Sequence, residues 1–340
     1  MTTPVGSLTE RHPTPSTARL LNELVPPRHF ASSTFESYRP DPSHASQSIA
    51  LEVVQSFARA LPARRPIGWA ARRRSLGAAR GVYLDGGFGV GKTHLLAALA
   101  HAAGPADAAY GTFAEYTHLV GALGLAATLE ALAAKRVVCI DEFELDDPGD
   151  TVLMARLLRE LTDRGVALAA TSNTLPESLG EGRFAAEEFL REIQSLAARF
   201  EVVPVDGPDY RHRDPSERAP SFPDSEARER GARIQAMCDD FTALLAHLAT
   251  IHPSRYGALL DGVPAVALSG VGAVPDQSAA LRLVVLVDRL YDRDVPVVLG
   301  GQGAEGLFSA AMLRGGYRKK YFRALSRLSA LAVQGAALTS

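Results

Sequence analysis

A glycine-rich loop at residues 86–93 constrains the fold of this chain more than any other stretch. It completes the G-x-x-x-x-G-K-[ST] pattern of a phosphate-binding loop, with Gly86, Gly87, Phe88, Gly89, Val90, Gly91, Lys92 and Thr93. An apolar run, 81–84, precedes the loop, and a helix-forming run, 95–99, follows it. Strand, glycine loop and helix in this order predict a P-loop nucleoside triphosphatase.

The residue types in this loop suit the chemistry of a triphosphate. Glycines let backbone N–H groups turn inward around an anionic phosphate chain, and the positive end of the following helix points to the same place. Lys92 is expected to reach the β- and γ-phosphates, and the Thr93 hydroxyl to ligate Mg²⁺. His94 is included among the residues expected to contact ATP. The alternative, a glycine-rich turn before a helix, has no need for Lys and Thr at these positions.

A second part of the expected site follows the run 136–140. This run is apolar from residue 137, as is typical of a strand buried on both faces of a parallel sheet, and it leads into Asp141 and Glu142. Asp141 is expected to hold Mg²⁺, directly or through water, and Glu142 to orient and deprotonate the attacking water. Two surface carboxylates at a strand end are the alternative. The phosphate loop upstream, with a strand and a helix between, favours the catalytic interpretation.

Asn173 follows the next apolar strand, 166–170, and is expected at the same edge of the sheet. There its side chain can hydrogen-bond the γ-phosphate or the lytic water. A turn-capping Asn before Pro176 is the alternative.

Phosphoryl transfer commonly uses an arginine, often from a neighbouring subunit. Arg183, Arg191 and Arg199 follow Asn173, and Arg183, in a glycine-flanked loop, is the preferred candidate. Arg327, near the C-terminus, is a weaker candidate. Each arginine taken alone is more typical of a surface residue than of an arginine finger.

The alternation of strands and helices between 81 and 205 predicts an α/β fold with a parallel sheet, which holds ligands at the carboxyl ends of its strands. A helical segment rich in Ala and Leu is expected over 115–132, and a helix over 232–249. Four parts are expected: a flexible N-terminal arm (1–30), a P-loop ATPase core (31–213), a linker rich in Pro, Ser and Arg (214–231) and a smaller C-terminal α/β region (232–340).

The composition is that of a globular protein without bulk attraction to a polyanion, with 46% hydrophobic residues, 22% charged residues and a formal charge of -2. A local basic patch, Arg64 to Arg74, is interpreted mainly as a solvated surface. Cys139 and Cys238 lie far apart in the sequence, which favours a reducing, cytoplasmic compartment. The sequence shows no signal peptide and no apolar run long enough to span a membrane.

Other kinds of site fit the sequence poorly. The spacing of His and Cys suits no zinc site, and no Ser, His and Asp arrangement indicates a hydrolase triad. A dinucleotide-binding interpretation of the glycine loop fails because Lys92 and Thr93 follow and the third glycine comes one residue early.

Taken together, these motifs resemble the ZapE-type cell-division ATPase family, a branch of P-loop ATPases related to the AAA+ class. The similarity covers most of the chain. Its motifs occur in the family's order: Phe35-Glu36-Ser37-Tyr38-Arg39-Pro40, 86–93, Asp141-Glu142-Phe143, Thr171-Ser172-Asn173, Phe189-Leu190, Asp209-Tyr210-Arg211-His212-Arg213 and Ser326-Arg327-Leu328. Residues 111–120 are similar to the actinobacterial branch in particular.

The resemblance implies an AAA+-like core and a cytoplasmic protein that depends on Mg²⁺ and ATP. It further implies a ring or transient homo-oligomer, peripheral at the division site, that acts on polymers of the tubulin-like protein FtsZ. The chain departs from the family at 186–188, where Ala-Glu-Glu stands instead of a basic residue before Phe189 and Leu190. The arginine finger is therefore expected elsewhere, with Arg183 preferred.

Two other functions remain open from the sequence. A DNA-associated helicase loader or transposition ATPase shares the start Gly91-Lys92-Thr93-His94-Leu95, and would use the patch Arg64 to Arg74 to contact phosphates. A nucleotide-gated adaptor would bind ATP and barely turn it over. The intact pair Asp141 and Glu142 argues against the adaptor.

Overall fold

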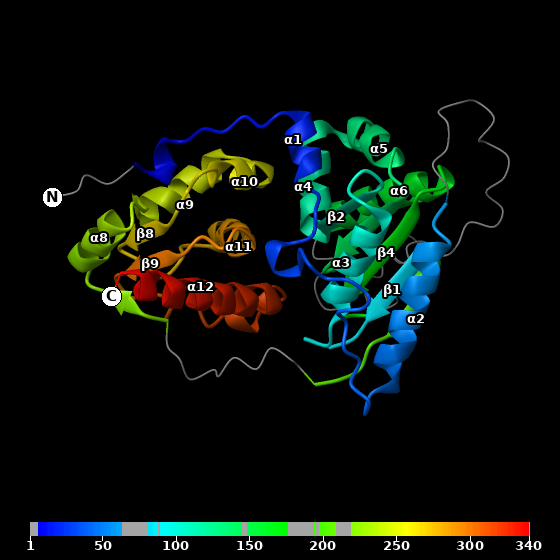
Figure 1. The fold of residues 1–340 in the computed structure, drawn as a ribbon. Helices are drawn as coiled ribbons and strands as arrows, with labels where there is room; N and C mark the ends of the chain where they lie inside the picture. The colour runs from blue at the N-terminus through cyan, green and yellow to red at the C-terminus, as the bar shows by residue number, and fades with distance from the viewer. Residues whose placement is uncertain are drawn as a thin grey trace. The chain divides into compact units, whose positions relative to one another are not determined.

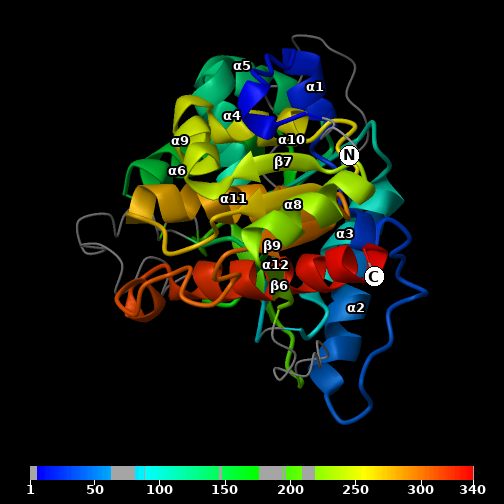
Figure 2. The same cartoon turned by 90° about the vertical axis from the view of Figure 1, so that its left-hand side faces the viewer.

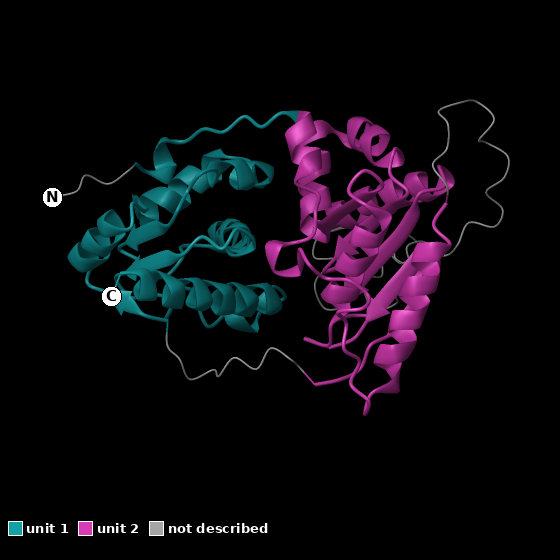
Figure 3. Cartoon of the chain, in the orientation of Figure 1, with its two compact units in different colours: residues 1–16, 214–340 teal, residues 17–213 magenta. Residues whose placement is uncertain are grey.

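The computed structural model describes residues 6–62, 81–87, 89–144, 148–175, 194, 197–208 and 219–339. The chain divides into two compact units (Figure 3). Residues 17–213 are here called the P-loop unit, and residues 1–16 together with 214–340 are called the C-terminal unit. Each unit has its own parallel sheet and its own apolar core.

The sheet of the P-loop unit has the strand order β2-β3-β4-β1-β5, and every adjacent pair is parallel. Its strands are β1 (Gly81–Asp85), β2 (Ala108–Thr112), β3 (Val137–Asp141), β4 (Ala167–Ser172) and β5 (Phe200–Pro204). The carboxyl ends of all these strands meet at one edge. Because β4 lies between β1 and β3, the segment after β4 lies between the glycine loop and Asp141.

Helices cover both faces of this sheet (Figure 1). They are α1 (Thr17–Asn22), η2 (Arg28–Phe30), α2 (Ala45–Arg59), α3 (Lys92–Ala103), α4 (Phe113–Leu123), α5 (Leu125–Ala133) and α6 (Pro148–Asp163). Helices α2 and α3 pack with one set of strand side chains, which includes Val82 and Cys139. Helices α1, α4, α5 and α6 pack with the alternate set, which includes Tyr83 and Ile140. Successive side chains of a strand point to opposite faces, and this is why the strands are apolar throughout.

The helical segment expected over 115–132 consists of two helices, α4 and α5, bent by 119°. Gly124 separates them with a φ of +79°, a backbone conformation that glycine adopts without the steric cost borne by other residues. The start of α4 is set by a capping box, in which Thr112 and Glu115 satisfy each other's backbone N–H groups. The composition did not reveal the break, because both helices are rich in Ala and Leu.

The sheet of the C-terminal unit has the order β6-β9-β8-β7 and is also parallel. Its strands are β6 (Ser221–Phe222), β7 (Met237–Asp240), β8 (Val266–Ser269) and β9 (Val297–Gly300). Its helices are η1 (Leu8–Glu10), α8 (Asp224–Arg233), α9 (Phe241–Thr250), η6 (Pro253–Arg255), α10 (Tyr256–Leu259), α11 (Gln277–Asp292), η7 (Met312–Arg314) and α12 (Arg318–Leu338).

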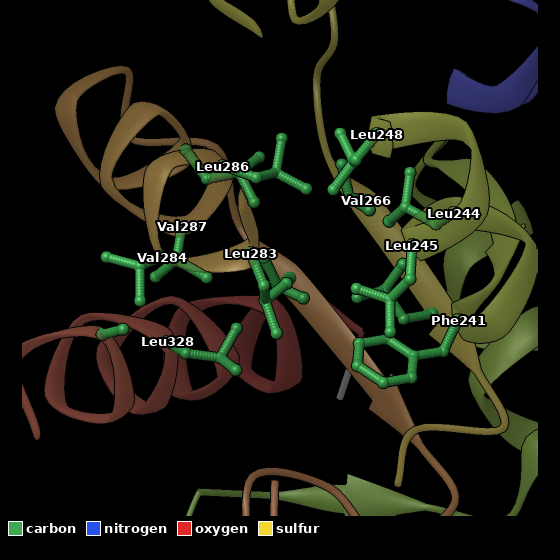
Figure 4. Packing of buried hydrophobic residues seen from close by; sticks show 14 of the residues in the cluster. Phe241, Leu244, Leu245, Leu248, Val266, Leu283, Val284, Leu286, Val287 and Leu328 are labelled. Atoms are coloured by element: carbon green, nitrogen blue, oxygen red, sulfur yellow. The ribbon is translucent and has the colours of Figure 1, made fainter. Parts of the chain in front are cut away.

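The two faces of this sheet are covered differently. Helix α8 crosses one face (Figure 2), where its Ala227 packs in a cluster of small side chains with Ala267 of β8. Helices α9, α11 and α12 cover the other face and form the larger core (Figure 4). At Gly335 on α12, a Cβ would lie 2.2 Å from the backbone oxygen of Val297, so this helix packs directly on β9.

Two sequence expectations differ from the structure at the start of this unit. Residues 214–231 were expected to be a linker, but those from 219 onward contribute β6 and most of α8. Residues 232–249 were expected to be one helix, but they hold the end of α8, strand β7 and most of α9. The four-residue strand is too short to show a periodicity of its own. Asp240 then caps α9, since its side chain accepts from the N–H of Ala243.

The N-terminal residues that the structure describes also differ from the flexible arm expected over 1–30. Leu8 is fully buried in the core of the C-terminal unit. Asp239, at the end of β7, accepts from the backbone N–H groups of Leu8 at 3.0 Å and Thr9 at 3.2 Å. Farther along, α1 contributes Leu20 to the core of the P-loop unit. Polar and proline-rich composition did not reveal these apolar anchors.

No single helix in the described ranges is long and apolar enough to cross a membrane. The bent pair α4 and α5 passes such a test only when its two parts are counted together, by length and composition.

Candidate nucleotide-binding site

The polar residues expected at the site meet at the carboxyl edge of the P-loop unit's sheet. The glycine loop follows β1, Asp141 ends β3, and Asn173 follows β4, which is the strand between them. There Lys92 contacts Asn173, and Thr93 contacts Asp141. Phe88 lies outside the described residues.

Two glycines of the loop are required by close approaches. At Gly86 a Cβ would lie 2.1 Å from the backbone oxygen of Val205. At Gly91, where φ is +93°, a Cβ would lie 2.6 Å from the ring of Tyr38. At Gly87, by contrast, a Cβ would meet nothing within 4 Å. Gly86 and Gly91 therefore keep the loop closed against its surroundings, whereas Gly87 leaves room above the loop.

Lys92 begins α3, and its ammonium lies inside the loop. Its Nζ donates to the backbone oxygens of Gly86 at 2.7 Å and Gly87 at 2.5 Å, and to Oδ1 of Asn173 at 2.9 Å. The side chain is buried. A charge-assisted donor placed among loop carbonyls can exchange these partners for phosphate oxygens. The hydrogen bond from Lys92 also places Asn173 next to the glycine loop.

Asp141 accepts four hydrogen bonds from the residues that the structure describes. Its Oδ1 accepts from the hydroxyl of Thr93 at 3.3 Å, from the N–H of Glu142 at 3.1 Å and from the hydroxyl of Thr171. Its Oδ2 accepts from the hydroxyl of Tyr110 at 2.8 Å. This buried carboxylate is thus satisfied and oriented by its neighbours.

Glu142 has a φ of +51°, which is unusual for a residue with a side chain. The Thr171 hydroxyl oxygen accepts from its N–H at 3.2 Å, and the Thr171 backbone oxygen accepts from the N–H of Phe143 at 2.7 Å. Phe143 is fully buried, edge-on to Tyr83, Phe113 and Phe200. The buried ring therefore fixes the turn that carries Glu142. Strained backbone of this kind is frequent at functional sites.

A carboxyl at the end of β1, Asp85, was not singled out in the sequence. Burial raises the pKa of Asp85 above its ordinary value, and the positive charge of Lys92 opposes this shift. The neighbouring Tyr83 donates from its hydroxyl to the backbone oxygen of Thr174 at 2.7 Å, which ties the end of β4 to β1. This hydrogen bond connects the segment after β4 to the strand that precedes the glycine loop.

The side chain of His94 contacts the segment 34–38, which precedes α2. Its Nε2 lies 3.0 Å from the hydroxyl oxygen of Ser37 and 3.0 Å from the backbone oxygen of Thr34. Its ring centroid lies 5.5 Å from that of Tyr38, whose hydroxyl donates to the backbone oxygen of Val90. Tyr38 thus touches the glycine loop, a contact that the family-like stretch 35–40 did not by itself indicate.

The arginine candidates fall in three places. Arg183 and Arg191 lie outside the described residues, as does the basic patch Arg64 to Arg74. Arg199 lies at the amino end of β5, where its backbone oxygen accepts from Gly81 and its guanidinium donates to Thr162. This is the opposite edge of the sheet from Lys92, so Arg199 cannot serve the site of its own chain.

Arg327 is engaged within the C-terminal unit. Its Nη1 donates to Oδ1 of Asp288 at 2.5 Å, and its guanidinium lies 5.1 Å from the ring centroid of Tyr291.

The oxygen atoms at this edge suit Mg²⁺, which needs few protein ligands, better than they suit a metal ion that is coordinated by protein side chains alone. A carboxylate and a hydroxyl, Asp141 and Thr93, face each other, and these are the hard oxygen ligands that Mg²⁺ prefers. Among the described residues, no group of three or more His, Cys, Asp and Glu side chains could hold a metal ion. A site with few protein ligands fits an ion that keeps waters and binds substrate phosphates.

Two further residues that the sequence did not single out, Tyr110 and Thr171, donate to Asp141. Thr171 lies in the family-like Thr-Ser-Asn stretch, which could have signalled it. Tyr110 lies in β2, two residues before the strand ends, and only the register of the neighbouring strand shows what it faces.

The family model for AFG1-like ATPases matches residues 14–230 and 216–337 of the chain. The chain is 28% identical to the cell division protein ZapE of Escherichia coli strain K12 over 268 residues, which covers 66% of this chain and 71% of that protein. Among solved structures, the match to DnaI covers 56% of this chain and 99% of the DnaI chain, with 17% identity and a TM-score of 0.44. The match to AMPPCP-bound DnaA from Aquifex aeolicus covers 52% of this chain and 50% of the DnaA chain, with 16% identity and a TM-score of 0.40.

Proposed function

The chain belongs to the AFG1-like ATPase family and hydrolyses ATP, and from this premise we propose that turnover is Mg²⁺-dependent and remodels FtsZ polymers. The observation that carries the catalytic part is the convergence at one sheet edge of Lys92, Thr93, Asp141 and Asn173. The match to a protein named for cell division supports the choice of target.

In this proposal the loop residues hold the triphosphate. The backbone of 86–91 surrounds the phosphates, and Lys92 exchanges its bonds to the carbonyls of Gly86 and Gly87 for phosphate oxygens. Asn173 keeps its contact with Lys92 and reaches the γ-phosphate or the lytic water from β4. When bound at Thr93 and Asp141, Mg²⁺ supplies charge neutralisation to the phosphates.

Glu142 is the proposed general base. Its carboxylate stands one residue beyond Asp141 on a turn held by Thr171 and Phe143, so it can accept a proton from a water molecule at the same edge. Arg183 is proposed as the arginine finger, supplied to a neighbouring subunit of a homo-oligomer. The protein is further proposed to be cytoplasmic and peripheral at the division site.

An ATPase assay with and without FtsZ filaments, together with filament sedimentation, tests the function. We expect filaments to change turnover and turnover to change the sedimented fraction. Lys92→Ala should abolish nucleotide binding, because the buried ammonium is the loop's charged donor. Glu142→Gln should keep binding and lower kcat by about 100-fold or more, since a general base contributes about that much.

Several outcomes would contradict parts of this proposal. Rapid phosphate release by Glu142→Gln would rule out its role as the base. Unchanged turnover and unchanged sedimentation with filaments would rule out FtsZ as the target. Single-strand DNA binding with a steep salt dependence, lost when Arg72, Arg73 and Arg74 are replaced, would instead favour the helicase-loader function.

A further inference from the structure

Tyr110 lies next to the carboxylate of Asp141 and has no role in the function proposed above. It is buried, and its hydroxyl donates to Oδ2 of Asp141 at 2.8 Å. The other three donors to Asp141 all use Oδ1. Among the described residues, Tyr110 is therefore the only donor to Oδ2. Oδ2 of this carboxylate thus accepts from β2, whereas Oδ1 accepts from the start of α3 and from residues at the ends of β3 and β4.

The register of the sheet explains how Tyr110 reaches Asp141. On the parallel pair β2 and β3, Tyr110 stands opposite Cys139, and Thr112 stands opposite Asp141. Cys139 and Asp141 are two residues apart and so point to the same face, which Tyr110 shares. The ring packs with Cys139 in the core on the α3 side of the sheet. Its hydroxyl then extends along β3 by one residue pair, to the carboxylate that ends the strand.

Packing fixes the direction in which the Tyr110 hydroxyl donates. The ring is rigid and is buried in the core beside Cys139, so the hydroxyl is held at Asp141 in a way that a flexible side chain would not be.

We propose that Tyr110 is a positioning residue that holds Oδ2 of Asp141 and thereby keeps Oδ1 directed at the Thr93 hydroxyl, where a divalent cation is bound with the nucleotide. The inference rests on the proposed role of Thr93 and Asp141. Groups that orient a metal ligand commonly change metal affinity by 10- to 100-fold when removed. Without Tyr110, the carboxylate can rotate, and its free oxygen competes for the cation in the wrong geometry.

The substitution Tyr110→Phe removes one oxygen atom and keeps the ring that fills the core. Tyr116→Phe is the matched control. Tyr116 is also fully buried, and its hydroxyl donates to the backbone oxygen of Cys139 at 3.2 Å on the same strand, without touching Asp141. Both variants lose one buried hydrogen bond, so a purely structural effect should be similar in the two.

The experiment measures binding of Mn²⁺, used as a spectroscopic probe, to the full chain in the presence of ADP by electron paramagnetic resonance. We expect Tyr110→Phe to weaken Mn²⁺ binding about 10-fold and Tyr116→Phe to leave it unchanged, while both lower the melting temperature without metal to a similar extent. In steady state, Tyr110→Phe should raise the Mg²⁺ concentration for half-maximal turnover by a similar factor.

Equal Mn²⁺ affinity in Tyr110→Phe and Tyr116→Phe would overturn the proposal. No Mn²⁺ binding by the wild-type chain would overturn both the metal role of Asp141 and this inference. If Mn²⁺ binding is weakened in Tyr110→Phe alone, as expected, but turnover has no effect on FtsZ filaments, Tyr110 remains the positioning residue and only the proposed target is ruled out.

Discussion

At the scale of single residues, the phosphate loop shows why two residues of one type are not equivalent. Gly86 and Gly87 are adjacent and both match the motif, yet only Gly86 has backbone atoms within reach of an added Cβ. The oxygen it would meet belongs to Val205, whose N–H donates to the backbone oxygen of Asp85 at 2.7 Å. A larger residue at 86 would therefore separate the chain after β5 from the start of the loop.

We predict that Gly86→Ala destabilises the P-loop unit by about 2–3 kcal/mol, because a Cβ 2.1 Å from the Val205 oxygen forces backbone to shift. Gly87→Ala is the matched control and should change the ligand-free melting temperature little. Differential scanning calorimetry without nucleotide compares the two. Equal melting temperatures for Gly86→Ala and the wild type would show that the close approach is relieved at no cost.

At the scale of elements, α11 and α12 are joined by charge as well as by apolar packing. Asp288 on α11 accepts from Arg323 at 2.8 Å and from Arg327 at 2.5 Å, both on α12. Burial alone would raise the pKa of Asp288, but the two guanidiniums together outweigh it and hold the pKa below its ordinary value. The carboxylate therefore stays charged and connects the two helices.

We predict that Asp288→Asn destabilises the C-terminal unit by about 2–4 kcal/mol, because two largely buried guanidiniums lose their anionic partner. Glu229→Gln is the control, since its pair with Arg233 is exposed and should matter by less than about 1 kcal/mol. Urea denaturation measures both. A loss for Asp288→Asn no larger than that for Glu229→Gln would contradict the prediction.

The same contact sets a pH dependence. A carboxyl whose pKa is lower in the folded chain stabilises it above the unfolded value, here 3.8, and loses that contribution as pH falls through the folded pKa. The wild-type C-terminal unit should therefore lose stability below this pH more steeply than Asp288→Asn.

How far the sequence predicted the elements depended on their length. The helix-forming run 95–99 lies within α3, and the apolar runs 81–84, 136–140 and 166–170 agree with β1, β3 and β4 to within two residues at each end. The short strand β7 and the break at Gly124 were missed. A four-residue strand has too little sequence to show a period, and one glycine within an Ala- and Leu-rich run does not by itself end a helix.

At the scale of the whole molecule, the chain starts in one unit, builds the other and then returns. Leu8 is buried in the same core as residues of α9. On that helix, Nε2 of His247 lies 2.9 Å from the backbone oxygen of Arg11. The guanidinium of Arg11 donates to the backbone oxygens of Leu259 and Asp261, both at 2.8 Å. The N-terminal segment is therefore an integral part of the C-terminal unit.

We predict that the two units respond separately to two changes, because each has its own core. Leu8→Ala should lower the melting temperature of the C-terminal unit by an amount that reflects about 2–5 kcal/mol. A non-hydrolysable ATP analogue with Mg²⁺ at about 100 times its Kd should stabilise the P-loop unit by about 2.7 kcal/mol. Calorimetry of the full chain measures both.

Leu338→Ala is the control for the first change, because Leu338 is 60% exposed whereas Leu8 is 0% exposed. Lys92→Ala is the control for the second and should show no shift with the analogue. Equal effects of Leu8→Ala and Leu338→Ala would mean that the N-terminal segment does not hold the unit together.

The sequence by itself determined the glycine loop, the polar residues at strand ends and the parallel α/β class. Each of these is written in neighbouring residues, because turn chemistry and hydrophobic periodicity are local properties. Tertiary structure alone decided that Tyr110 donates to Asp141, that Arg199 lies at the far edge of the sheet and that Leu8 fills the core of the C-terminal unit. These contacts join residues distant in sequence, and they follow from which strands are neighbours and in what register, which no local pattern specifies.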